Sequence, residues 1–127
     1  MKTRKVERES FIQIIYRFFL LSKTSSESIQ EVLDGFQVEL DETESKNLIY
    51  LLENIQAYAE KIEPLLGDKW TWERISPLHK AILICGAHEI LEIKNVKAIV
   101  IDASLDISRK YAPSIDPKFL NPILDSF

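Results

Sequence analysis

Histidine and cysteine side chains are the first candidates for chemistry in this sequence. The chain holds two histidines, His79 and His88, and one cysteine, Cys85. On a helix, nine residues turn the chain by about 900°, which places the two histidines on opposite faces. Cys85 and His88 alone are too few for a zinc site, which takes four ligands. The sequence therefore predicts no metal centre and no other cofactor.

Two carboxylates, Asp102 and Asp106, are spaced to share one helix face, and paired carboxylates can carry out acid–base catalysis. Arg109 and Lys110 follow Asp106 at helical spacing, which is typical of a surface laced with ion pairs. The sequence has no G-x-S-x-G elbow, no G-x-x-x-x-G-K-[ST] loop and no G-x-G-x-x-G motif. We therefore expect no catalytic residue, and a protein that is not an enzyme.

Basic residues gather at the N-terminus of a chain whose net charge is −4. Residues 1–23 hold six basic and two acidic side chains, a net +4 that leaves −8 for the rest. Charges attract over about 8–10 Å at cellular salt. This end could therefore hold phosphates although the protein as a whole is acidic. A solvated, frayed terminus explains the same charges.

Lys118 and Phe119 form a second candidate site for phosphates and bases. They follow Asp116-Pro117, which begins the last predicted helix. The start of a helix presents free N–H groups and a partial positive charge, which suit a phosphate. A lysine and an aromatic ring there could hold a nucleic-acid backbone and stack a base. Alternatively, Phe119 packs in the core and Lys118 is only solvated.

The composition favours one all-α domain over residues 1–127. The chain is 46% hydrophobic and has three glycines, which suits helices with short connections. A single cysteine fits the reducing cytoplasm, and no segment is long enough to span a bilayer. Basic residues before FIQIIYRFFLL resemble a signal peptide. However, Gln13 and Arg17 interrupt the apolar run and no clear cleavage site follows.

Helical periodicity and capping patterns predict about seven helices. The first covers about 4–21, with a core face at Phe11, Ile14, Ile15 and Phe18. Its other side, which should be more exposed, holds Lys5, Glu9, Gln13 and Tyr16.

Two capping boxes, at Thr24–Glu27 and Asp41–Glu44, should open the next two helices. The second of these helices is expected to run unbroken through Leu48 and Ile62 to Pro64. Further helices should cover about 77–93 and 96–111, and the last should start at Asp116-Pro117.

Two C-terminal segments resemble the NusB family of small helical transcription antitermination factors. They are Ile101–Arg109, matching the family's INEAVELAK run, and Lys118–Asp125, matching KFVNGVLD. The N-terminus resembles the family's Arg-rich start followed by Gln-x-x-Tyr, here Gln13 to Tyr16. The resemblance implies two packed three-helix bundles.

In function, the resemblance implies a cytoplasmic factor that binds single-stranded boxA-type RNA of ribosomal RNA leaders. It would bind jointly with the ribosomal protein NusE and load onto transcribing RNA polymerase. The residues it implies for RNA binding are Lys2, Arg4, Lys5, Arg8, Gln13, Lys118 and Phe119. Those it implies for the partner are Tyr16, His79 and Lys80, with Tyr16 on the exposed side of its helix.

The sequence departs from the family pattern at four positions. His79 stands for an acid, Ile84 for an arginine, Ala103 for a glutamate and Pro122 for a glycine. Pro122 should fall near the sixth position of the last helix and kink it. Two alternatives therefore stay open. One is a protein-binding adaptor that has lost the RNA site. The other is an RNA-targeting module that acts with a separate methyltransferase.

Overall fold

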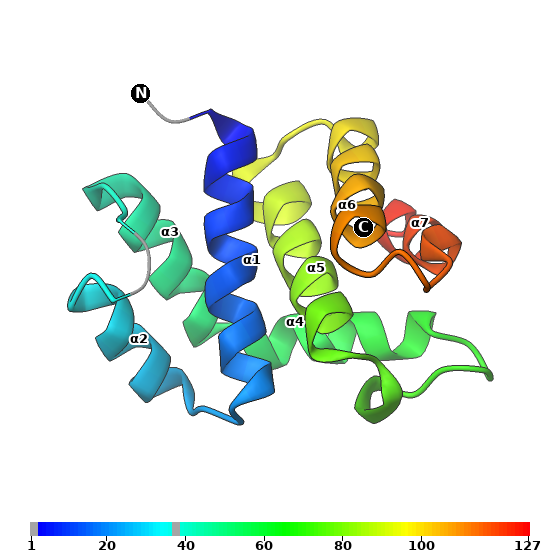
Figure 1. Cartoon of the computed structure of the whole chain (residues 1–127), viewed down its shortest axis with the longest axis horizontal. Helices are drawn as coiled ribbons and strands as arrows, with labels where there is room; N and C mark the ends of the chain where they lie inside the picture. The colour runs from blue at the N-terminus through cyan, green and yellow to red at the C-terminus, as the bar shows by residue number, and fades with distance from the viewer. Residues whose placement is uncertain (1–2, 37–38) are drawn as a thin grey trace.

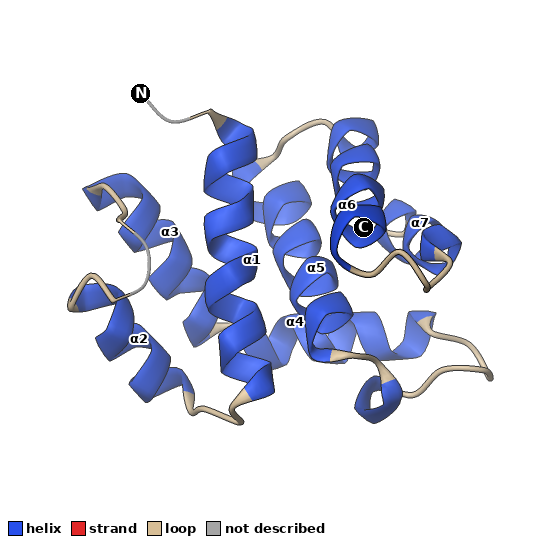
Figure 2. Ribbon diagram, in the orientation of Figure 1, coloured by secondary structure: helices blue, strands red, loops and turns tan. Residues whose placement is uncertain are grey.

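A computed structural model describes residues 3–36 and 39–127. Within them the chain forms seven α-helices and no strand, which confirms the all-α prediction (Figures 1 and 2). The α-helices are α1 Arg4–Leu20, α2 Ser25–Leu33, α3 Glu42–Glu53, α4 Ile55–Ile62, α5 Pro77–His88, α6 Lys97–Tyr111 and α7 Leu120–Asp125. Shorter turns are η1 Glu63–Leu65, η2 Trp72–Arg74, the π-turn η3 Glu89–Ile93 and η4 Pro117–Phe119. No helix in the described segments is both long and apolar enough to cross a bilayer.

Both predicted capping boxes are confirmed. The Thr24 hydroxyl accepts from the Glu27 N–H at 3.2 Å, and the Glu27 carboxylate accepts from the Thr24 N–H at 2.8 Å. Asp41 and Glu44 make the same exchange at 2.8 and 3.1 Å. Because each box satisfies two N–H groups that the helix leaves open, α2 and α3 start where the sequence places them.

The prediction of a single long helix through Leu48 and Ile62 is wrong, because the helix is interrupted at Asn54. Its backbone leaves the helical region, with φ −111° and ψ 12°. The Asn54 side-chain amide donates to the Tyr50 carbonyl at 2.8 Å. Asparagine competes for backbone partners in this way, which favours helix ends over helix interiors. The chain therefore forms two helices, α3 and α4.

The helices fall into two groups of three. In the first, α1, α2 and α3 contact one another, and in the second α5, α6 and α7 do so. α4 packs against α5, and the most extensive contact joins α1 to α5 across the two groups (Figure 1). This is the architecture of two packed three-helix bundles that the resemblance implies.

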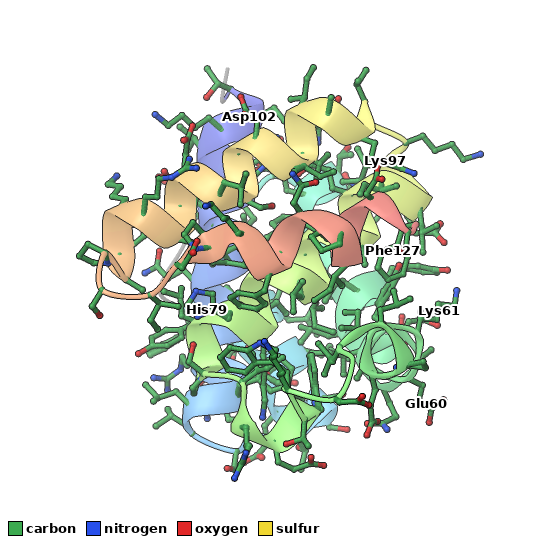
Figure 3. All side chains as sticks on the ribbon, turned by 90° about the vertical axis from the view of Figure 1, so that its right-hand side faces the viewer. Glu60, Lys61, His79, Lys97, Asp102 and Phe127 are labelled. Atoms are coloured by element: carbon green, nitrogen blue, oxygen red, sulfur yellow. The ribbon has the colours of Figure 1, made fainter. Side chains whose placement is uncertain are left out.

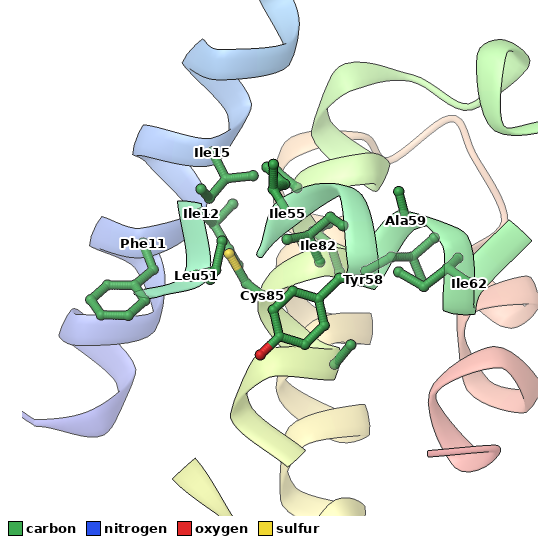
Figure 4. Close-up of a cluster of buried hydrophobic side chains, with 14 of the residues drawn as sticks. Phe11, Ile12, Ile15, Leu51, Ile55, Tyr58, Ala59, Ile62, Ile82 and Cys85 are labelled. Atoms are coloured by element: carbon green, nitrogen blue, oxygen red, sulfur yellow. The ribbon is translucent and has the colours of Figure 1, made fainter. Parts of the chain in front are cut away.

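The core lies where α1, α3, α4 and α5 meet (Figure 4). Ile15, Leu51 and Ile82 are completely buried there. Burying an aliphatic side chain of this size contributes about 1.5–3 kcal/mol, so this cluster fixes the position of α1 against α5. Neighbouring side chains in the same cluster are Phe11, Ile12, Ile55, Tyr58, Ala59, Ile62 and Cys85.

The close packing of α7 on α5 depends on a glycine. A Cβ built on Gly86 would lie 2.8 Å from Cδ2 of Leu124, so only glycine allows this approach without a shift. The kink expected at Pro122 is wrong. η4 precedes α7, so Pro122 is the third residue of α7, in the first turn, where an N–H has no partner within the helix.

Candidate functional site

A groove runs between α1 and α6, and its wider part is an apolar pocket of about 430 Å³. Half-buried Tyr16 and exposed Tyr111 contribute aromatic rings to its wall. Both could anchor a partner, since a tyrosine offers a large apolar body with a polar tip. The other lining residues are Glu9, Ile12, Gln13, Leu78 and Ile107.

A charged pocket of about 220 Å³ adjoins the apolar one, and the two share Glu9 and Ile107. Lys5 and Lys110 bring two ammonium groups to it from α1 and α6. Lys110 Nζ lies 3.9 Å from the Glu9 carboxylate, whereas Lys5 has no ion-pair partner in the described segments. The groove thus joins an apolar surface to a charged one, in which the two lysines lie beside the carboxylates of Glu9 and Asp106. The remaining lining residues are Arg8, Ala103 and Asp106.

Arg8 was expected to contact RNA, but the structure turns it inward. Its side chain is 8% exposed and forms a two-pronged ion pair with Glu89 of η3, with N···O distances of 2.9 and 2.8 Å. Asn95 completes the network, donating to the same carboxylate at 2.7 Å. The guanidinium therefore holds α1 against the α5–α6 connection. The prediction that Arg8 contacts an RNA phosphate is corrected, because its side chain is buried and paired with Glu89.

The other basic and polar residues predicted at this end differ in how free they are. Arg4 is exposed but paired with Glu7 at 3.1 Å, and burial raises the pKa of the Glu7 carboxyl although Arg4 lowers it. Gln13 is exposed at the rim of the apolar pocket. Lys2 lies outside the described residues. Lys5 is thus the cation here with neither a partner nor burial to restrain it, among the residues that are described.

Tyr16 is more enclosed than its helix face predicts. The ring is half-buried and packs against the core, because α6 and the start of α5 lie beside it. It nonetheless faces the apolar pocket together with Leu78. Tyr16 was predicted to be exposed on the side of α1 away from Phe11 and Ile15. In the structure it is half-buried, and a partner could reach its ring only from within the groove.

His79 was expected to extend the partner surface, but it is buried, at 2% exposure. Its Nδ1 lies 2.7 Å from the Ser76 hydroxyl and its Nε2 lies 2.9 Å from the Ser108 hydroxyl of α6. Burial lowers the pKa of this imidazole. Figure 3 shows the residue between α5 and the chain that leads into α7. The expectation of a surface histidine is corrected, because α6 and η4 cover the first turn of α5.

His88 is the second buried histidine, and it sits in an aromatic cage. The rings of Phe11, Tyr50 and Tyr58 lie 5.8 to 6.3 Å from it, centroid to centroid. Its Nδ1 lies 3.1 Å from the Tyr58 hydroxyl, and its Nε2 has no hydrogen-bond partner among the described residues. Burial lowers the pKa of His88 to about 4. No three His, Cys, Asp or Glu side chains in the described part could hold a metal ion together.

Lys80, the third predicted partner residue, lies beside Phe19, which is close to the C-terminal end of α1. Its ammonium sits 5.5 Å from the ring centres of both Phe19 and Trp72. Such contacts stabilise a cation by about 0.5–1 kcal/mol where solvent is near. Lys80 is therefore half-buried and held in place rather than extended into solvent.

The Lys118–Phe119 pair resembles the alternative in which the ring packs on the core and the lysine is solvated. The Asp116 carboxylate accepts from the Lys118 N–H at 3.0 Å and so caps the start of η4. This N–H is therefore bonded to a carboxylate and is not free for a phosphate. Lys118 itself is exposed. Phe119 is half-buried, with the Trp70 ring stacked on it at 5.2 Å and His79 tilted against it at 5.4 Å.

The structure separates the two ends of the RNA surface that the sequence predicts. Figure 1 shows α6 between the N-terminal end of α1 and the segment that carries Lys118 and Phe119. Trp70 and Tyr111, 38% and 55% exposed, were not predicted as binding residues. Tyr111 could have been found, since it lies four residues after Ile107 on the same helix face. Nothing in the sequence places Trp70 over Phe119.

Comparisons with known proteins agree over nearly the whole chain. The model of the NusB family matches residues 5–127. The chain is 33% identical, over 135 aligned residues, to the transcription antitermination protein NusB of Helicobacter pylori (strain Shi470). The alignment covers 99% of this chain and 92% of that protein.

Two solved structures share the fold. The NusB structure from T. maritima superposes with a TM-score of 0.74 at 23% identity, covering 99% of this chain and 91% of that one. A chain from the crystal structure of a plectonemic RNA supercoil superposes with a TM-score of 0.77 at 24% identity, covering 99% and 94%.

Proposed function

The chain belongs to the NusB family, and on this premise we propose that it binds single-stranded boxA-type RNA together with the ribosomal protein NusE. In this proposal the complex loads onto transcribing RNA polymerase in the cytoplasm and promotes antitermination. The chain contributes binding surfaces and catalyses no reaction. A relative that is 33% identical over nearly the whole chain is named as a transcription antitermination protein, which supports the proposal.

The observation that carries the proposal is the groove between α1 and α6. In its charged part the unpaired ammonium of Lys5 suits a phosphate, and its apolar part, with Tyr16 and Tyr111, suits a protein side chain. Because the two parts adjoin, RNA and NusE would complete one continuous surface. With a net charge of −4, the free protein should bind RNA weakly until the partner is present.

Replacing Lys5 with glutamine should weaken RNA binding and reduce its salt dependence. One lost contact to a single-strand phosphate lowers the slope of log affinity against log salt by about 0.7. The measurement is fluorescence anisotropy of labelled boxA-type RNA with NusE at several salt concentrations. Lys61→Gln on α4 removes the same charge from an exposed position far from this end of α1 (Figure 3) and should leave the slope unchanged.

Replacing Tyr16 with alanine should weaken the binding of NusE by about 2 kcal/mol or more if the ring is an interface anchor. Tyr16→Phe keeps the ring and should lose far less. Titration calorimetry measures both, with Tyr50→Ala on α3 as a control for removal of an exposed ring elsewhere. Equal binding by wild type and Tyr16→Ala would move the interface away from the groove.

The two titrations also separate the proposal from the adaptor alternative. Arg8 is held internally and Asp116 caps the turn before α7, so fewer of the predicted groups are free for RNA. An adaptor would bind NusE with normal affinity and show no salt-dependent RNA binding in the complex. The absence of both interactions would refute the proposed function altogether.

A further inference from the structure

The indole of Trp70 is an exposed aromatic surface in the connector between η1 and η2. It is 38% exposed, and its ring lies nearly parallel to that of Phe119, at 5.2 Å and 22°. Phe119 is its only ring neighbour within the described residues. Trp72, two residues later, is more enclosed, with its ring edge-on to Phe19 at 5.8 Å. The two tryptophans therefore differ in what they can still contact.

Trp70 rests on a stack that is anchored in the protein interior. Phe119 beneath it lies 5.4 Å from the ring of His79 and packs against the core. His79 is in turn fixed on both ring nitrogens by Ser76 and Ser108, at 2.7 and 2.9 Å. A ring held in this way loses little conformational freedom when a ligand stacks on it, which favours binding.

Two exposed lysines adjoin the stacked rings in the sequence. Lys69 and Lys118 precede Trp70 and Phe119 in sequence, both are exposed, and in the described part of the chain neither has a carboxylate partner. Asp116 is occupied in capping the turn. Aromatic faces beside lysines are the usual combination for holding single-stranded nucleic acid, because every base has a face to stack and a phosphate beside it.

We infer that Trp70 is a stacking platform for one base of single-stranded RNA, with Lys69 and Lys118 beside the neighbouring phosphates. This inference rests on the proposed function and adds a binding residue to it. Trp70 lies in the connector between η1 and η2, whereas Lys5 lies near the start of α1, so an RNA strand that touches both must cross the surface between these two segments.

The test uses the two tryptophans as matched probes. Trp72→Phe leaves Trp70 as the only indole of the chain, and Trp70→Phe leaves Trp72. Each variant is titrated with boxA-type RNA in the presence of NusE while tryptophan emission is recorded. The difference between the two titrations belongs to Trp70, because the partner is common to both. We expect emission to be quenched in the Trp72→Phe protein and little changed in the Trp70→Phe protein.

Affinity provides the second readout. Trp70→Leu removes the aromatic face and should weaken RNA binding about 5- to 160-fold, whereas Trp70→Phe should stay within about 3-fold of wild type. Thermal unfolding of Trp70→Leu identifies any loss that comes from misfolding. Tight RNA binding by all variants with unquenched Trp70 overturns this inference and leaves the proposed function intact. If the wild-type complex does not bind RNA, both are overturned.

Discussion

Replacing Arg8 with alanine should destabilise the protein by about 3–5 kcal/mol, because it leaves the Glu89 carboxylate charged, buried and without its guanidinium. Both side chains of this pair are under a tenth exposed. Urea unfolding measures the effect. Lys5→Ala, three residues earlier on an exposed part of the same helix, should change the free energy of unfolding by less than about 0.5 kcal/mol.

The double variant Arg8→Met with Glu89→Leu sharpens this result. Removing both charges and filling the space with apolar atoms should recover most of the stability, since a buried ion pair and an apolar pair are often equivalent. Asn95 would lose an acceptor, so the recovery should be incomplete. If Arg8→Ala unfolds at the wild-type midpoint but loses RNA affinity, Arg8 faces solvent and acts on RNA directly.

Lowering the pH should destabilise the protein through His88, beginning at a pH well above that at which carboxylates titrate. The pKa of His88 is about 4 in the folded protein and ordinarily about 6.5 in an unfolded chain. As the pH falls below 6.5, His88 becomes protonated in the unfolded state but stays neutral in the folded state. The stability from this group is complete above pH 6.5, falls between about 6.5 and 4, and then levels off. The loss is on the order of 3 kcal/mol.

The His88→Gln variant tests this assignment, because glutamine does not titrate and can still bond to the Tyr58 hydroxyl. Free energies of unfolding at pH 7.5 and pH 4 should differ by about 3 kcal/mol less in the variant than in the wild type. His79, whose pKa burial also lowers, is present in both proteins and cancels in the comparison. Parallel curves would place the acid sensitivity outside the cage of Phe11, Tyr50 and Tyr58.

The sequence predicted those features that depend on neighbouring residues. The capping boxes at Thr24 and Asp41 involve groups three residues apart, and the structure has both. The break at Asn54 was missed because Leu51 and Ile55 keep helical spacing across it. Apolar periodicity measures which side of the chain faces the core, and a turn that preserves that side leaves the pattern unchanged.

The candidate site was harder to predict, because it depends on contacts between distant segments. Arg8 resembles its basic neighbours in the sequence, and its partner Glu89 lies 81 residues away. His79 occupies the first turn of α5, a place that is usually exposed, and only the packing of α6 brings Ser108 over it. The sequence therefore identified which residue types could act in the site, but it could not predict which of their side chains are buried.

The position of α5 far along the chain has a consequence for synthesis on the ribosome. α1 ends at Leu20, but the helix against which it packs most extensively begins only at Pro77. At about 5–20 residues per second, α1 waits several seconds for that partner. During this interval α2 and α3 can cover only part of its apolar face. The nascent chain therefore exposes an apolar helix surface until more than half of the chain has been synthesised.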